Sequence, residues 1–161
     1  VAGTLSRVVS ELDSTISDIR TTIFELDSFD SSVTVTDRLA NISRELRARL
    51  GIDATVVIAP GVDHEISPSA AREMFTALRE ALANIARHAR ATRVRISVTL
   101  PDHVLLTVED NGVGLAAGDG AGRGIRNLHR RAVENGGFCT IAAGREGGTL
   151  VTWSIANGGM K

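Results

Sequence analysis

The chain has 161 residues, of which 43% are hydrophobic, 23% are charged and only 3% are aromatic, and its formal net charge is −1. This composition is typical of one globular domain with an aliphatic core, and it gives no electrostatic basis for a nucleic-acid partner or an anionic membrane surface. Because Cys139 is the only cysteine, an internal disulfide and a cysteine-cluster metal site are excluded. Cys139 stands in a short apolar run, which predicts a buried and unreactive thiol.

No apolar run approaches the roughly 18 residues of a membrane-crossing helix, and no signal peptide opens the chain. We therefore expect a cytoplasmic location, which leaves room for a membrane-associated full-length protein. The chain begins at Val1, without a methionine and already inside a helical pattern, so we interpret it as a fragment of a longer protein.

Apolar residues recur in the first segment with alternating steps of four and three, the spacing of a heptad repeat. They are Leu5, Val9, Leu12, Ile16, Ile19, Ile23 and Leu26. The strict spacing favours a coiled coil or a four-helix bundle formed with another chain; a helix packed on its own domain is the alternative. Residues 28–32 resemble a linker, which predicts a boundary between a helical unit, residues 1–30, and a domain, residues 31–161.

The domain is expected to open with a helix that ends at Gly51 and a short buried strand over residues 54–59. Ser67 and Pro68 then supply the N-cap and the first-turn proline of a longer helix that runs to about Ala89.

Alternation of apolar and polar residues, with turn residues between, predicts four more strands. They cover Arg93–Leu100, Val104–Glu109, Phe138–Ala143 and Thr149–Ala156. A glycine-rich loop, residues 110–124, and a helix over residues 125–134 separate the two pairs, and residues 157–161 are expected to be a loose tail. This order lacks the strand–helix alternation of a doubly wound fold and predicts an α+β two-layer sandwich, with helices on one face of a mixed sheet.

The first motif with chemical potential is Asp110-Asn111-Gly112-Val113-Gly114, at the end of a predicted strand. A carboxylate in this place can accept a hydrogen bond from the exocyclic amine of adenine, and the two glycines let the backbone approach a flat ligand. Taken alone, the motif is no more specific than an ordinary Asp-Asn-Gly turn.

A polar face on the long helix is the second motif, and it consists of Glu80, Asn84, Arg87 and His88. A carboxylate and an amide one turn apart suit magnesium or a phosphoryl group. The alternative is a solvated face with an ion pair such as Glu80–Arg87.

Gly122 and Gly124 form the third motif, because they stand immediately before a predicted helix. Free backbone N–H groups and the positive end of the helix then face the loop, which is typical of phosphate binding. A flexible loop is the alternative, and no Gly-Lys-Ser/Thr of a Walker loop follows. Thr149, after a pair of glycines, places a hydroxyl at the start of the last strand.

In this order the motifs resemble those of the GHKL superfamily of ATP-binding domains, which includes gyrases, heat-shock chaperones, histidine kinases and mismatch-repair ATPases. The resemblance covers residues 34–156. The segment from Arg79 to Ala89 and the segment from Gly124 to Ala132 are similar to the N box and second glycine box of sensor histidine kinases of the nitrate-sensor type. Residues 17–26 resemble actinobacterial gas- and redox-sensing kinases.

The resemblance implies a Bergerat-type ATP-binding fold and a role for each matching residue. Asp110 would accept from the adenine amine with help from Thr149, and Asn84 would hold Mg²⁺ between the phosphates of ATP. Glu80 would be the catalytic residue, as a base or as a group that orients the acceptor. The other implied ATP-binding residues are Arg87, His88, Gly112, Gly114, Gly122, Arg123 and Gly124.

The implied activity is transfer of the γ-phosphoryl group of Mg-ATP to a histidine. The heptad segment resembles the second helix of a dimerisation and phosphoacceptor hairpin, which implies a homodimer and a response regulator receiver domain as downstream partner. None of the four histidines, His64, His88, His103 and His129, stands in an acceptor motif. We therefore expect this chain to bind ATP without phosphorylating itself, and expect the acceptor within ~40 residues before its start, the spacing of an antiparallel helical pair.

Two alternatives remain open from the residues. One is a serine kinase of the anti-sigma-factor type, which has no need of a phosphoacceptor hairpin. The other is a non-catalytic interaction module in which bound nucleotide only orders the lid, residues 115–121.

Overall fold

The computed structural model describes residues 3–4, 32–100, 102–114 and 122–158. The predicted heptad helix and the predicted lid lie outside the described residues. Among the helices that are described, none is both long enough and apolar enough to cross a bilayer.

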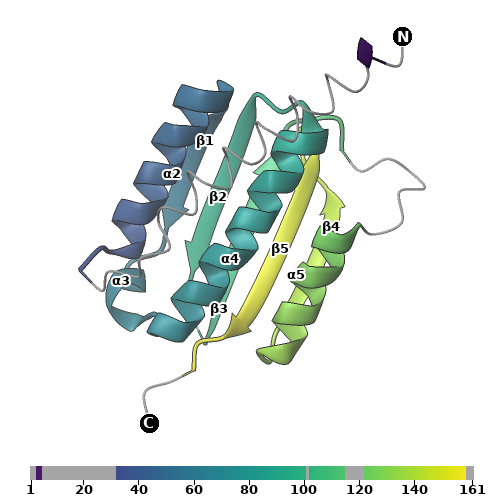
Figure 1. The fold of residues 1–161 in the computed structure, drawn as a ribbon. Coiled ribbons are helices and arrows are strands. Elements are labelled where there is room, and N and C mark those ends of the chain that lie inside the picture. The colour runs from purple at the N-terminus through teal and green to yellow at the C-terminus, as the bar shows by residue number, and fades with distance from the viewer. Residues whose placement is uncertain (1–2, 5–31, 101, 115–121, 159–161) are drawn as a thin grey trace.

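Five strands form one mixed sheet in the order β1-β2-β3-β5-β4 (Figure 1). Their bounds are Asp53–Ile58 for β1, Arg93–Thr99 for β2, His103–Asp110 for β3, Phe138–Ala143 for β4 and Thr149–Ala156 for β5. Only β1 and β2 run parallel, and the other neighbours are antiparallel. β5 therefore lies inside the sheet, with its first residue beside the end of β3.

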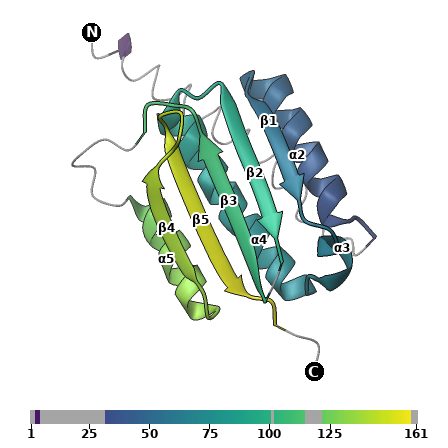
Figure 2. The same cartoon turned by 180° about the vertical axis from the view of Figure 1, so that it is seen from behind.

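Three helices cover one face of this sheet: α2 (Val35–Leu50), α4 (Pro68–Asn84) and α5 (Arg123–Glu134). Figure 2 shows the strands in front of all three helices, and within the described ranges no element covers this second face. The predicted α+β two-layer sandwich is confirmed.

Local sequence signals define where the helices begin and end. Thr34 and Ser67 are N-caps whose hydroxyl oxygens accept hydrogen bonds from the backbone N–H groups of Asp37 and Ala70, and Pro68 follows in the first turn of α4. Gly51 ends α2 in the left-handed region at φ 65°. The predicted caps at Ser67 and Gly51 are confirmed.

The core lies between the helices and the sheet, and strand alternation supplies the sheet's part of it. Residues of β2 and β3 that point toward the helices, such as Ile96 and Leu106, are fully buried, as is Trp153 on β5. Cys139 is buried as predicted, and this burial raises the pKa of its thiol to about 11.

The long helix departs from its predicted end. Regular α-helix stops at Asn84, and the next five residues form a π-helical turn, η2 (Ile85–Ala89), which ends at Arg90 in the left-handed region at φ 49°. A single π turn inside or at the end of an α-helix is often found at a functional site.

Other boundaries also differ from expectation. A short helix, α3 (Val62–Glu65), was not predicted, and α5 begins at Arg123 rather than at residue 125. The prediction of a loose tail is wrong at Asn157, because its side chain accepts a hydrogen bond from Ser67 N and donates one to the carbonyl of Glu65. Both contacts join segments about 90 residues apart, which no local pattern reveals.

Candidate functional site

A cavity of about 490 Å³ opens between the end of α4, the start of α5 and the adjoining ends of β3 and β5. Its apolar lining residues are Ala81, Ile85, Ala89, Val108, Val113, Ile125, Ile141 and Val151. Its polar side chains are Asn84, His88, Asp110 and Thr149. A volume in this range, with apolar walls and a few polar groups, is typical of a small-molecule site.

Asp110 is the polar anchor of the cavity, and only 3% of its surface is exposed. Its Oδ1 accepts a hydrogen bond from Gly112 N at 2.7 Å, and its Oδ2 accepts one from Thr149 N at 3.2 Å. Because each carboxylate oxygen offers two acceptor positions, both oxygens retain capacity for a donor on a ligand.

Gly148 allows this arrangement because of its backbone. It lies in the left-handed region at φ +62°, and a Cβ placed on it would be 2.1 Å from the carbonyl oxygen of Asp110 and 2.5 Å from Oδ1. Any side chain would displace the carboxylate, so glycine is required beside Asp110.

The first glycine motif, residues 110–114, is hydrogen-bonded to the π turn η2. Val113 N donates to the carbonyl oxygen of Ala89 at 2.8 Å, and a Cβ on Gly112 would lie only 2.0 Å from that oxygen. The turn therefore brings its last carbonyl group to the loop that follows Asp110. This contact gives η2 a defined role in positioning one wall of the cavity.

The second glycine motif packs against the polar face of α4. A Cβ on Gly124 would be 2.0 Å from Glu80 Oε1 and 3.3 Å from Asn84 Oδ1. Gly122 is the N-cap of α5, it makes no side-chain capping bond, and both glycines line the cavity. The N–H groups of the first turn of α5 thus adjoin the cavity, where an anion would be stabilised.

The structure brings most of the predicted site together. Asn84, His88, Asp110, Gly114, Gly122, Gly124 and Thr149 line the cavity. Gly112 and Glu80 adjoin it through the contacts above, whereas Arg87 is not among the lining residues. Glu80 and Arg87 form no ion pair among the described residues, so that alternative receives no support. The side chain of Arg123 lies outside the described part.

The apolar residues that line the cavity were not among the predicted site residues. Val108 precedes Asp110 by two residues on β3, and Val151 follows Thr149 by two residues on β5. Residues two apart on a strand share a face, so this signal was available once the polar members had been identified.

The residues near Asn84 fit a magnesium ion only if a bound nucleotide supplies some of the ligands of that ion. Among the described residues, no group of three or more His, Cys, Asp or Glu side chains could hold a metal alone. Asn84 offers one amide oxygen at the cavity, and Mg²⁺ is usually held by one or two protein oxygens together with phosphates and waters.

The sequence profile of the family described as "Histidine kinase-, DNA gyrase B-, and HSP90-like ATPase" matches residues 69–158, which hold every lining residue of the cavity. The chain belongs to this ATPase family. The predicted GHKL resemblance is thereby confirmed, and the family membership supports the use of ATP.

Curated relatives agree with this membership. "Sensor histidine kinase YvfT" of Bacillus subtilis is 30% identical over 138 residues, which cover 81% of this chain and 34% of that protein. "Sensor histidine kinase YxjM" of the same organism is 23% identical over 152 residues, 94% of this chain and 37% of that protein. The chain therefore spans about a third of the length of these relatives.

Solved structures show the same fold. The blue-light activated histidine kinase of Erythrobacter litoralis EL346 superposes with a TM-score of 0.65 at 17% identity, over 96% of this chain and 59% of that one. The ATP binding domain of PrrB from Mycobacterium tuberculosis gives a TM-score of 0.59 at 23% identity, over 80% of this chain and 96% of that one.

Proposed function

We propose that the chain is the ATP-binding catalytic part of a sensor histidine kinase, which transfers the γ-phosphoryl group of Mg-ATP to a histidine in two-component signalling. The observation that carries the proposal is a buried carboxylate, Asp110, in the wall of a largely apolar cavity that is also lined by Gly122 and Gly124 at the N-terminus of α5. The relatives named as sensor histidine kinases favour histidine over serine as acceptor.

At the adenine end, Asp110 accepts a hydrogen bond from the exocyclic amine of the base. The backbone N–H groups of Gly112 and Thr149 hold the carboxylate in place, and the hydroxyl of Thr149 assists at the rim. Gly112 and Gly114 keep the loop close to the ring. Val108 and Val151 supply an apolar wall for a flat base.

At the phosphate end, Asn84 would offer its amide oxygen to Mg²⁺, and His88 lies beside it on the cavity wall. Gly122, Arg123 and Gly124 bind phosphate oxygens at the positive end of α5, and Arg87 adds charge from the neighbouring turn. A bound Mg²⁺ would neutralise charge that builds up during phosphoryl transfer.

Glu80 acts on the acceptor. Its carboxylate lies against Gly124 and one helical turn from Asn84, so it is held next to the phosphate end rather than in the apolar part of the cavity. From there it deprotonates or orients the acceptor imidazole. A Glu80→Gln variant separates this role from binding, because it should lower phosphotransfer and leave ATP affinity unchanged.

The acceptor histidine comes from a dimerisation hairpin whose second helix is residues 1–30, joined to the catalytic domain of residues 31–161. The whole protein would be a homodimer that passes its phosphoryl group to a response regulator receiver domain.

Nucleotide binding tests the adenine site directly. We expect Asp110→Asn to weaken ATP binding by at least a hundred-fold, because the buried site loses an acceptor and gains a mispaired donor. The matched control is Glu109→Gln on the same strand, which faces the other side of the sheet and should leave the affinity unchanged. Equal affinities of Asp110→Asn and the unaltered protein in calorimetric titrations would show that the adenine site is assigned wrongly.

Phosphotransfer tests the activity. When an acceptor hairpin is supplied as a separate chain, the product should be acid-labile and alkali-stable, as phosphohistidine is, and Asn84→Ala should reduce its formation. An acid-stable product on a partner would identify a serine kinase instead. ATP binding without any transfer, together with altered dimer contacts in the variants, would favour the non-catalytic module.

A further inference from the structure

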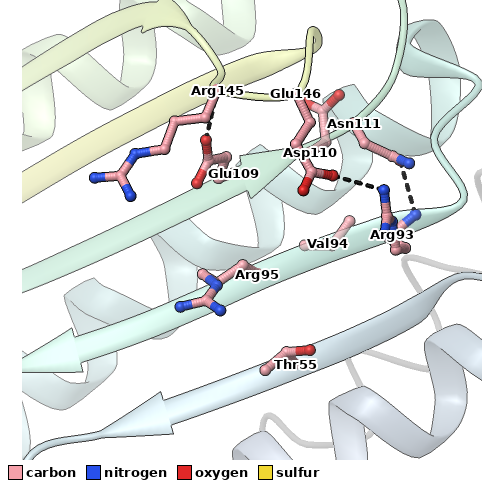
Figure 3. Close-up of a pocket in the computed structure, with 9 residues that line it drawn as sticks. All are labelled: Thr55, Arg93, Val94, Arg95, Glu109, Asp110, Asn111, Arg145 and Glu146. Atoms are coloured by element: carbon pink, nitrogen blue, oxygen red, sulfur yellow. Dashed lines mark hydrogen bonds and ion pairs between the residues drawn. The ribbon is translucent and has the colours of Figure 1, made fainter.

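A second hollow of about 320 Å³, the outer hollow, lies on the face of the sheet that the helices leave open (Figure 3). Thr55, Arg95 and Glu109 are neighbours across three strands in its lining. Asn111, which is half-buried, also lines the outer hollow, but it does not line the cavity proposed to bind ATP. It therefore follows Asp110 in the chain without facing the nucleotide.

The side chain of Asn111 binds the start of β2 and the residue before it. Its Oδ1 accepts hydrogen bonds from Thr92 N at 3.0 Å and from Arg93 N at 2.8 Å, and its Nδ2 donates to Thr92 Oγ1 at 3.0 Å. The backbone adds a bond from Asn111 N to the carbonyl oxygen of Arg93 at 3.2 Å. Figure 3 shows Asn111 and Arg93 next to each other at the end of the hollow. One amide side chain thus joins the end of β3 to the chain that enters β2.

This entering chain is the short connection between η2 and β2, residues 90–92. Arg90 in this connection lies in the left-handed region at φ 49°. A non-glycine residue stays in that region only where the surrounding structure holds it there. Because the connection is short, a restraint on Thr92 also restrains η2, which carries His88 and directly follows Asn84. Asn111 therefore holds the polar wall of the cavity against the adenine loop.

We propose that Asn111 is a positioning residue for the nucleotide, and that it fixes the separation between Asp110 and the phosphate-binding residues Asn84 and His88. This inference rests on the proposed function. It adds to that function a residue that touches neither the adenine nor the phosphates and acts through the connection after η2.

The carboxylate of Asp110 does not depend on the Asn111 side chain, because Gly112 N and Thr149 N hold it. Loss of the amide would therefore leave the adenine anchor in place and let η2 shift relative to it. A ligand that binds both groups of residues at once would then lose more affinity than a ligand that binds only one, since it must pay the cost of ordering them.

Two ligands separate positioning from general support of the fold. Mg-ATP binds both groups of residues, whereas adenosine has no phosphates and binds only the adenine site. We expect Asn111→Ala to weaken Mg-ATP binding about ten-fold and adenosine binding by less than about two-fold. Calorimetric titration measures the first affinity and chemical-shift titration the second, both at a temperature where each variant is folded.

Asn157→Ala is the matched control. The side chain of Asn157 also accepts from a backbone N–H group, that of Ser67, and donates to a backbone carbonyl, that of Glu65, but it does not line the cavity. Its loss should lower the stability in urea denaturation to a similar extent and leave both affinities unchanged.

Two further variants act on the same amide. Asn111→Asp keeps an acceptor for Thr92 N and Arg93 N, so it should recover most of the Mg-ATP affinity. Thr92→Val removes only the bond from Asn111 Nδ2 and should weaken Mg-ATP binding about two-fold, which provides a test if Asn111→Ala does not fold.

Equal weakening of both ligands by Asn111→Ala would overturn the proposal, because Asn111 would then support the adenine loop alone. It is also overturned by unchanged Mg-ATP affinity in Asn111→Ala, by no recovery in Asn111→Asp, or by an equal loss of affinity in Asn157→Ala. If Asn111→Ala does not fold, unchanged Mg-ATP affinity in Thr92→Val overturns it. These results leave the proposed nucleotide site standing, whereas an unaltered chain that binds no Mg-ATP would contradict the proposed function and this inference together.

Discussion

Two neighbouring acidic residues at the end of β3 face opposite sides of the sheet and are held in different ways. Asp110 points toward the helices, is 3% exposed and receives backbone N–H groups on both oxygens. Glu109 points outward, is half-buried and receives one backbone N–H group, that of Arg145. The inner site is built from backbone groups, which have little freedom, whereas the outer hollow is built from long side chains that can change rotamer.

One turn serves both faces. The segment from Gly144 to Thr149, the first residue of β5, donates to Glu109 through Arg145 N and to Asp110 through Thr149 N, so it is hydrogen-bonded to β3 on both faces of the sheet. The inner contact requires glycine at position 148, and the outer contact sets no such demand on its side chains. Substitutions should therefore be severe on the inner side of this turn and mild on the outer side.

The largest expected effect is that of Gly148→Ala. The new methyl group would meet the carbonyl oxygen of Asp110 at 2.1 Å, and the residue would remain in the left-handed region. We expect a loss of about 2–5 kcal/mol in the free energy of unfolding, from backbone strain and overpacking together. Urea denaturation measures this loss.

Gly51→Ala is the matched control for backbone strain. Gly51 has nearly the same φ, +65°, but a Cβ there meets nothing within 4 Å. Its substitution should cost about 1–2 kcal/mol, which is the strain alone. If the two variants lose the same stability, close packing against Asp110 contributes nothing and the inner site is less constrained than we describe.

A second prediction compares thiols on the two faces of β4. Burial raises the pKa of Cys139 to about 11 from the ordinary 9.0, so at pH 8 it should react with iodoacetamide about a hundred-fold more slowly than a thiol on the outer face. The outer thiol is supplied by Thr140→Cys in a Cys139→Ala background, since Thr140 is exposed. Similar rates would mean that β4 separates from α5 often enough to expose its inner side.

The thiol of Cys139 should also make the stability of the folded chain depend on pH. Because its pKa is higher in the folded chain than the ordinary value, the unfolded chain releases its proton first as pH rises. Stability should therefore be unaffected by this group below about pH 9 and should fall as pH approaches 11. In the Cys139→Ala variant this part of the decline should be absent from the pH profile.

Much of the fold could be predicted from the sequence because its signals are local. Ser67 and Gly51 are caps that act on their own helices, and the alternation along β2 and β3 assigns each side chain to a face. The site could be predicted as a set of motifs in a given order, since Asp110 and Asn84 each belong to one short pattern.

What could not be predicted depends on contacts between distant segments. The apolar spacing from Asn84 to Ala89 is compatible with an ordinary α-helix, and the contact of Ala89 with Val113 in the π turn joins residues 24 positions apart. The outer hollow requires the strand order, because Thr55, Arg95 and Glu109 become neighbours only when β2 lies between β1 and β3.

The smallest expected effect is that of Glu146→Gln on the outer face. Arg93 is held twice: its backbone N–H donates to Asn111 Oδ1 at 2.8 Å, and its guanidinium group pairs with Glu146, where both side chains are more than 60% exposed. We expect Glu146→Gln to change the unfolding free energy by less than about 0.5 kcal/mol, because an exposed ion pair is weak. Asn111→Ala, which also removes the bond to Thr92 N, should cost about 1–3 kcal/mol. A loss from Glu146→Gln as large as that from Asn111→Ala would mean that the exposed ion pair stabilises the outer face as much as hydrogen bonds to the backbone do, and the contrast between mobile side chains and fixed backbone groups would then fail.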